Sequence, residues 1–245
     1  MKRTPLVLAL IAAAALLAAG CGKDDAIPAS AGAPTTSTSA DDSTSTSTGD
    51  SSTTTAAAEE GDSGPSDTEA AEVRADLAAL LEEHTYLAGI TITRLVAEGA
   101  TGPNASAAAA ALDANSNALG DAVSSGFDPE VGEDFLRLWR GHITNYVSYA
   151  NARVANDAGS AGAATDALDT FAADTGDLFE TASEEAVSAD EVQEGLRTHV
   201  ESTLAAIDAT VSGSPDAVTL LREAASHAPD GAAVWARAMT AGDEA

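Results

Sequence analysis

Several residue types are scarce in this chain of 245 residues, and each scarcity excludes a class of protein. The single cysteine, Cys21, excludes an internal disulfide, so the fold must be stabilised by packing alone. Lysine and arginine together number 11 against 39 acidic residues, and the formal net charge is −28. Such a surface repels nucleic acid, because affinity for phosphate backbones comes from lysine and arginine.

Several motifs of known enzymes and metal sites are also missing. The chain contains neither a Gly-x-Ser-x-Gly elbow nor a glycine-rich nucleotide fingerprint. No His-x-x-x-His or Glu-x-x-His pair of the kind found in helical metal enzymes occurs. The only methionine after the first residue is Met239, which argues against a copper site with thioether ligands. These absences do not favour an enzyme.

The N-terminus has the three parts of an export signal. Lys2 and Arg3 are followed by an apolar run over 6–17 and by small residues just before Cys21. The run is shorter than the roughly 20 apolar residues that a membrane span needs. We therefore predict that residues 1–20 are a signal peptide removed by cleavage before Cys21.

The segment Leu17-Ala18-Ala19-Gly20-Cys21 resembles the lipobox of bacterial membrane lipoproteins. The resemblance implies a diacylglycerol thioether on Cys21, with an added N-acyl chain in some organisms. Two or three acyl chains anchor a protein firmly in the membrane, whereas a single acyl chain binds only weakly. Each methylene buried in the membrane adds about 0.8 kcal/mol to the free energy of binding. The mature protein is then expected at the cell membrane, lipid-anchored and facing the extracytoplasmic side. An ordinary secretory signal with an incidental cysteine is the alternative.

Residues 21–67 have no helical or strand periodicity. They consist largely of Ser, Thr, Ala, Gly and Asp, with alternating Ser and Thr over 43–48. This composition cannot build a hydrophobic core. We predict a disordered acidic linker over 21–67 that carries a separate domain over 68–245.

From residue 68 onward, apolar residues recur every three or four positions, which is typical of helices. Breakers such as Gly99, Pro103 and Pro129 separate the periodic stretches. We predict an all-α bundle of about six helices. The expected helices span 68–98, 104–125, 129–156, 161–186, 189–212 and 215–241.

The first, third and fifth of these helices share one frame. Each carries a histidine, His84, His142 or His199, and these are 58 and 57 residues apart. Apolar residues three and seven positions earlier place each histidine on the buried stripe of its helix. The other helices repeat with a similar period, because Asn115, Phe171 and His227 stand 56 residues apart. We predict three antiparallel helical hairpins of about 57 residues each.

This layout is similar to a group of poorly characterised bacterial helical proteins. Their units have a histidine in the first helix, and an Asn or Asp followed by Gly in the second. The matching positions here are His84, His142, His199, Asn115, Asp174 and Gly176, whereas Ala118 and Ala232 depart from the pattern. The resemblance implies no activity.

All four histidines fall on or near buried stripes, and three interpretations remain open. The first is a zinc or copper site, with His84, His142, His199 and His227 as ligands and Asp174 as a carboxylate ligand. In the second, each hairpin buries a neutral imidazole bonded to an Asn115-type or Asp174-type partner or to a backbone carbonyl. The third is histidine-based catalysis. Convergence of three rings within about 5 Å of a common centre favours the first.

Aromatic residues gather in the third and fourth helices. At helical spacing, Phe135, Trp139 and Tyr146 extend the buried stripe, so we expect them in the core. The adjacent acids Glu82 and Glu83 are expected to be solvated. The sequence as a whole predicts a non-enzymatic binding module for an envelope protein or a small-molecule ligand. A metal-binding or metal-dependent redox protein is the alternative.

Overall fold

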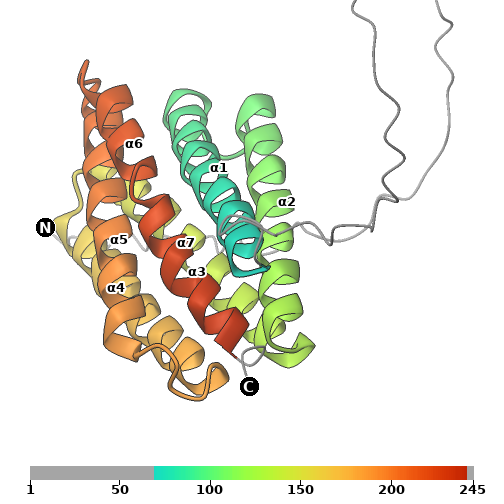
Figure 1. The fold of residues 1–245 in the computed structure, drawn as a ribbon. Coiled ribbons are helices and arrows are strands. Elements are labelled where there is room, and N and C mark those ends of the chain that lie inside the picture. The colour runs from blue at the N-terminus through green and yellow to red at the C-terminus, as the bar shows by residue number, and fades with distance from the viewer. Residues whose placement is uncertain (1–68, 242–245) are drawn as a thin grey trace, which may run out of the picture. The chain divides into compact units, whose positions relative to one another are not determined.

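The computed structural model describes residues 69–241, where all regular structure is helical, as predicted (Figure 1). The helices are α1 (Glu69–Glu98), α2 (Pro103–Gly126), α3 (Pro129–Ala155), α4 (Ala158–Ala182), α5 (Ala189–Ser212), α6 (Ala217–Ala225) and α7 (Ala228–Thr240). The predicted signal peptide over 1–20, Cys21 and the linker over 21–67 lie outside the described residues. Those assignments stay predictions.

The last predicted helix differs from the structure. Instead of one helix over 215–241, α6 ends at Ala225 and α7 begins at Ala228, with Pro229 in its first turn. Proline lacks the amide hydrogen that a continuous helix needs, and its ring clashes with the carbonyl four residues earlier. For Pro229 that carbonyl belongs to Ala225, the last residue of α6. His227 therefore lies in the interruption between the two helices.

Capping residues fix where several helices begin. The Asp128 carboxylate accepts hydrogen bonds from the first amides of α3, and Pro129 occupies the first helical position. Asp157 caps α4 in the same way, so that helix begins at Ala158 rather than at 161. The Ser188 hydroxyl caps α5. These caps keep the connections between hairpins short.

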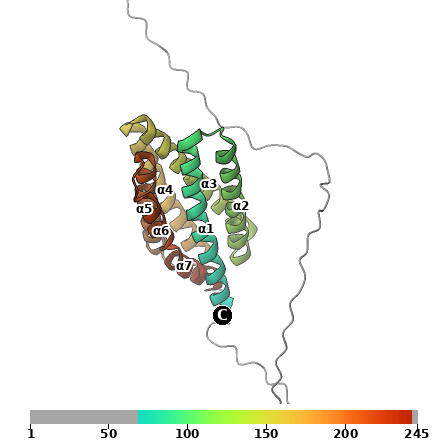
Figure 2. The ribbon, with the colours of Figure 1, turned by 90° about the horizontal axis from the view of Figure 1, so that it is seen from above.

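The helices pack as a closed ring of three hairpins. α1 pairs with α2, α3 with α4, and α5 with α6 and α7. The second helix of each hairpin also packs against the next hairpin, because α2 contacts α3, α4 contacts α5, and α7 contacts α1. Figure 2 shows α2 on one side of α1 and the α5–α6 pair on the other. Since α1, α3 and α5 also contact one another, they form the inner layer.

The buried apolar side chains form two clusters, and the three inner histidines lie between them along their helices. On α3, Trp139 belongs to the first cluster and Tyr146 to the second, with His142 between them. On α1, His84 follows Leu81 of the first cluster and precedes Ile92 of the second. Phe135, Trp139 and Tyr146 are at most 2% exposed, which confirms their predicted place in the core.

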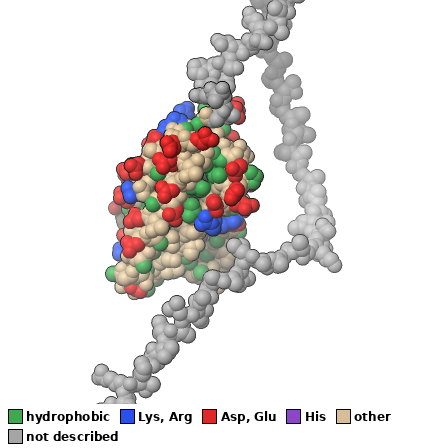
Figure 3. Space-filling model, turned by 90° about the horizontal axis from the view of Figure 1, so that it is seen from below, with side chains coloured by type: hydrophobic (Ala, Val, Ile, Leu, Met, Phe, Trp, Pro, Cys, Tyr) green, Lys and Arg blue, Asp and Glu red, His purple; other side chains and the backbone are tan. Residues whose placement is uncertain are grey.

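The surface of the bundle is acidic. Figure 3 shows acidic side chains spread over the displayed face and few basic ones. Exposed ion pairs such as Arg140–Asp113 and Arg153–Asp208 link neighbouring helices, but pairs of this kind contribute little to stability. Within residues 69–241, no helix has the length and apolar character that a membrane crossing requires. The negative field attracts cations and repels anions.

Candidate metal centre

Each inner helix presents one histidine toward the middle of the ring. His84, His142 and His199 each lie three residues after a buried apolar residue, namely Leu81, Trp139 and Leu196. Three residues make nearly one helical turn, so each histidine shares the inward face of its helix. His84 and His142 are fully buried, whereas His199 is half-buried and has a buried Nε2 atom.

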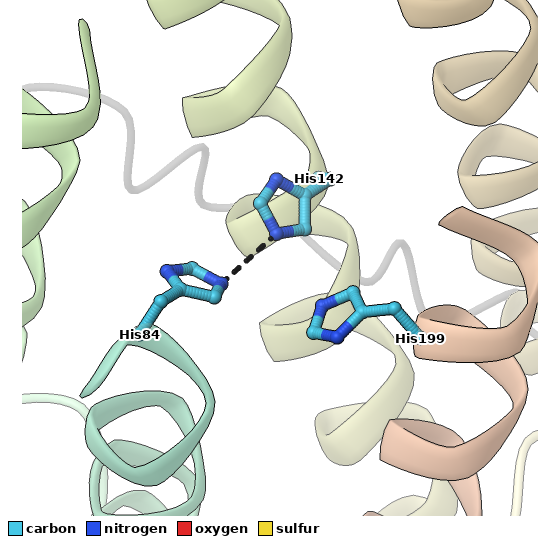
Figure 4. Close-up of side chains that lie close together, drawn as sticks. All are labelled: His84, His142 and His199. Carbon is cyan, nitrogen blue, oxygen red and sulfur yellow. Dashed lines mark hydrogen bonds between the residues drawn. The ribbon is translucent and has the colours of Figure 1, made fainter. Parts of the chain in front are cut away.

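The three histidine rings converge on one point. Their centroids are 5.2 Å apart for His84 and His142, 5.9 Å for His84 and His199, and 6.1 Å for His142 and His199. Figure 4 shows a ring nitrogen of His199 facing the gap between the other two rings. The nearly equal separations follow from the three-hairpin repeat, which brings equivalent positions of α1, α3 and α5 together.

The distances between the ring nitrogens suit a metal ion. A tetrahedral ion with metal–nitrogen bonds of about 2.0–2.1 Å holds its ligand atoms about 3.3 Å apart. The Nε2 atoms of His84 and His142 are 3.2 Å apart, and the ligand atoms of all three residues lie within 4.8 Å of one another. An inward shift of His199 by about 1–1.5 Å therefore completes a three-nitrogen set.

Burial keeps all three imidazoles neutral at pH 7. It holds the pKa values of His84 and His142 well below the ordinary 6.5, and neighbouring histidines lower both further. Burial, with the nearby His227, lowers the pKa of His199 to about 4. Neutral imidazole is the form that coordinates metals, so protons compete only weakly for these nitrogens near neutral pH.

Asn115 on α2 supports His84 from behind. Its amide nitrogen donates to the backbone carbonyl of Leu80 at 3.0 Å and to the carboxylate of Glu83 at 2.8 Å. These bonds hold the amide next to His84, whose pKa the Asn115 side chain raises against the effect of burial. Neither Oδ1 of Asn115 nor Nδ1 of His84 has a hydrogen-bond partner among the described residues. Asn115 is therefore a polar neighbour of the ligand His84 with an acceptor oxygen to spare.

His142 is held by aromatic packing. Phe171 on α4 stacks on its ring with centroids 4.5 Å apart and planes at 17°. Trp139 and Tyr146 meet the same ring edge-on, with centroids 4.3 Å and 5.4 Å away. The Nε2 atoms of His142 and His84 share one hydrogen bond, in which one ring is the donor and the other the acceptor according to their tautomers.

The centre also contains buried polar atoms that have no hydrogen-bond partner among the described residues. Such atoms are few in folded proteins, and a group of them at one place is expected where an ion or water binds. The three histidines contribute one each, and so do their neighbours Asn115, Trp139 and Tyr146.

The structure separates the residues that the sequence placed together as ligands. His84, His142 and His199 form the only group of this kind found among the described residues. Asp174 is exposed on α4 and lies outside the group. His227 is half-buried and also lies outside it, although it lines a cavity with His84 and His199. Cys21 is outside the described residues.

Glu83 was not predicted as part of the site. Glu83 is exposed, as the sequence indicated, but its carboxylate also accepts the amide of Asn115, the polar neighbour of His84. One signal was present, since Glu83 directly precedes His84. That signal is weak, because neighbouring residues on a helix point in different directions.

The centre can hold a metal ion through three neutral nitrogen donors. Imidazole donors suit zinc, copper, iron and nickel. No known protein family matches this chain, and neither a curated protein nor a solved structure matches it. The functional argument therefore depends on the residues themselves.

Proposed function

We propose that this protein is an extracytoplasmic, membrane-anchored lipoprotein whose helical domain binds a zinc or copper ion through His84, His142 and His199. The observation that carries the proposal is the convergence of three buried imidazoles from three helices, with ligand atoms within 4.8 Å of one another. Zinc and copper are the favoured ions, because both accept three imidazole ligands.

The surroundings support binding of a cation. Three neutral ligands leave the charge of the ion uncompensated, and a buried charge is costly without a counter-charge. The Glu83 carboxylate lies behind Asn115 and so places a negative charge beyond the ligand His84. The acidic chain, with a net charge of −28, further favours a cation over an anion.

The stability of the domain is also linked to the ion. The polar layer of histidines interrupts an otherwise apolar interior, and an ion that binds only the folded chain stabilises that chain. At a free metal concentration 100-fold above the Kd, the gain is about 2.7 kcal/mol. We therefore expect a higher thermal midpoint with zinc or copper present than with a chelator.

The direct test is metal content by mass spectrometry. The full chain is purified in detergent through an affinity tag without histidine, incubated with zinc or copper, and dialysed. We expect one ion per chain in the natural sequence, and none when His84, His142 and His199 are all replaced by glutamine. Circular dichroism checks that the variant remains helical.

Leu168→Ala is a stability-matched control. Leu168 is fully buried in the second apolar cluster, and its truncation costs about 2–5 kcal/mol without removing a ligand. It should keep the ion. If the natural sequence takes up neither metal, or if the folded glutamine variant binds as well as the natural sequence, the metal proposal fails.

The anchor is tested separately through Cys21. Replacing Cys21 with serine removes the thiol that acylation needs, so we expect the protein to move from the membrane fraction to the soluble fraction. Metal content should not change, because the histidines lie far along the chain from residue 21. A variant that stays with the membrane would contradict lipid anchoring at this residue and leave metal binding unaffected.

A further inference from the structure

A cavity of about 50 Å³ adjoins the three-histidine centre on one side. It lies between α1, α5 and the interruption between α6 and α7. His84, His199 and His227 line it together with Trp139 and apolar residues, whereas His142 does not. A water molecule needs roughly 10–15 Å³ on this measure, so the cavity holds a few waters or one triatomic molecule.

The cavity adjoins one of three equivalent positions of the repeat. Asn115, Phe171 and His227, 56 residues apart, stand beside the histidine of their own hairpin, and we call them the support positions. Asn115 is close enough to His84 to raise its pKa, and Phe171 stacks on His142. His227 is close enough to His199 to lower its pKa, but it is only half-buried.

The break between α6 and α7 accounts for the difference at the third support position. α2 and α4 run without interruption through Asn115 and Phe171, and both residues are buried. His227 instead lies between Ala225 and Ala228, where the helix is interrupted before Pro229. The support position of the third hairpin therefore leaves an open space beside His199, and His84 borders the same space.

We propose that this cavity holds a fourth, exchangeable ligand of the metal ion: a water molecule, replaceable by a small anion, hydrogen-bonded to His227. The inference rests on the proposed function. Three imidazoles leave one position of a tetrahedral ion free, and protein sites of this composition usually fill it with water or a substrate. Thr85 donates its hydroxyl to the Leu81 carbonyl, so the donors left to the cavity are His227, at the interruption between α6 and α7, and the indole Nε1 of Trp139.

The residues that line the cavity are compatible with a small ligand. Glu191 is part of the lining, and its carboxylate pairs with Arg237 of α7. The walls are otherwise mainly apolar, which lets the ion and His227 decide what binds. An anion is repelled by the acidic surface and enters only because the ion attracts it.

The test uses the full chain carrying cobalt(II) or copper(II), whose absorption spectra report ligand exchange, with azide as the probe. We expect azide to produce a saturable spectral change in the natural sequence. His227→Phe, which copies Phe171, should fill the cavity, keep one ion per chain and raise the Kd for azide at least about tenfold. His227→Gln keeps a donor and should stay within about threefold of the natural sequence.

Three outcomes would overturn the inference. If azide leaves the spectrum of the metal-bound natural sequence unchanged, the fourth position is not open. Equal azide affinity in His227→Phe places the exchangeable ligand outside the cavity. If folded His227→Phe loses the ion, His227 is itself a ligand. Metal content is measured in the same samples, so absence of the ion from the natural sequence identifies failure of the proposed function instead.

Discussion

The third hairpin differs from the first two at the point where all three meet. In each hairpin the inner helix contributes one histidine to the centre, in the same frame. In the first two, an uninterrupted outer helix places Asn115 or Phe171 against that histidine. In the third, the outer helix is divided into α6 and α7, and His227 lines a cavity instead.

The difference shows that the three hairpins can share the histidine ligands of the inner helices and still differ in the outer-helix residues that support those ligands. The inner helices give nearly equal spacing of the three rings, which any ion with three ligands requires. The side chains at the support positions differ in kind: an amide beside His84, an aromatic ring stacked on His142, and an imidazole that lines a cavity beside His199. Two of the histidines have a buried neighbour at their support position, and the third adjoins a cavity. Such an arrangement suits a metal site that exchanges one ligand.

Acid should have the largest effect on the metal-free protein. In the unfolded chain the histidines titrate near pH 6.5, whereas the pKa of folded His199 is about 4 and those of His84 and His142 are also well below 6.5. Below pH 6.5 the unfolded chain binds more protons, so the free energy of unfolding falls from pH 6.5 toward pH 4. His199 alone accounts for a loss of about 3 kcal/mol.

Urea unfolding at several pH values between 4 and 8 measures this loss. Replacing one histidine with glutamine removes the contribution of that histidine to the dependence of the unfolding free energy on pH. We expect nearly equal contributions above about pH 5, because all three folded rings are still neutral there, and a smaller contribution from His199 close to pH 4, where its folded ring takes up a proton. A flat profile for the natural sequence would contradict neutral burial.

Truncation at the support positions should have the next largest effect. Phe171 is 4% exposed and stacks on His142, so Phe171→Ala should lower the free energy of unfolding by about 3–5 kcal/mol. His227→Ala should cost less than about 1 kcal/mol, because His227 is half-buried beside an existing cavity. Urea unfolding of both metal-free variants at pH 7.5 gives the comparison, and similar losses would show that the third hairpin is packed as tightly as the second.

At Asn115 we expect a loss of stability between those of Phe171→Ala and His227→Ala. Asn115→Leu keeps the volume but removes the bonds to Leu80 and Glu83 and the support of His84, at a cost of about 1–3 kcal/mol. Loss of a support behind a ligand also weakens metal binding about 10–100-fold. Competition with a chelating dye measures that affinity. Asn117→Leu, two residues along on the exposed face of α2, is the matched control and should bind metal normally.

The sequence alone determined the helices and the faces that they bury. Periodic apolar residues, capping groups and breakers act within a few residues, so local patterns indicated helices close to those observed. The largest difference is in the last helix, where the pattern did not reveal the interruption before Pro229. The repeat of histidines on inward stripes could also be read, because a period needs no knowledge of tertiary packing.

Only the tertiary structure decided which of these residues meet. Metal motifs that can be recognised in sequence place two ligands on one helix, a few residues apart, and their absence counted against a metal site. Here each ligand comes from a different helix, at separations of 58 and 57 residues, and the ring of hairpins brings them to within 4.8 Å. Closure of the ring also left Asp174 exposed and placed His227 at the cavity, because both depend on how α4 and α6–α7 pack against the inner helices.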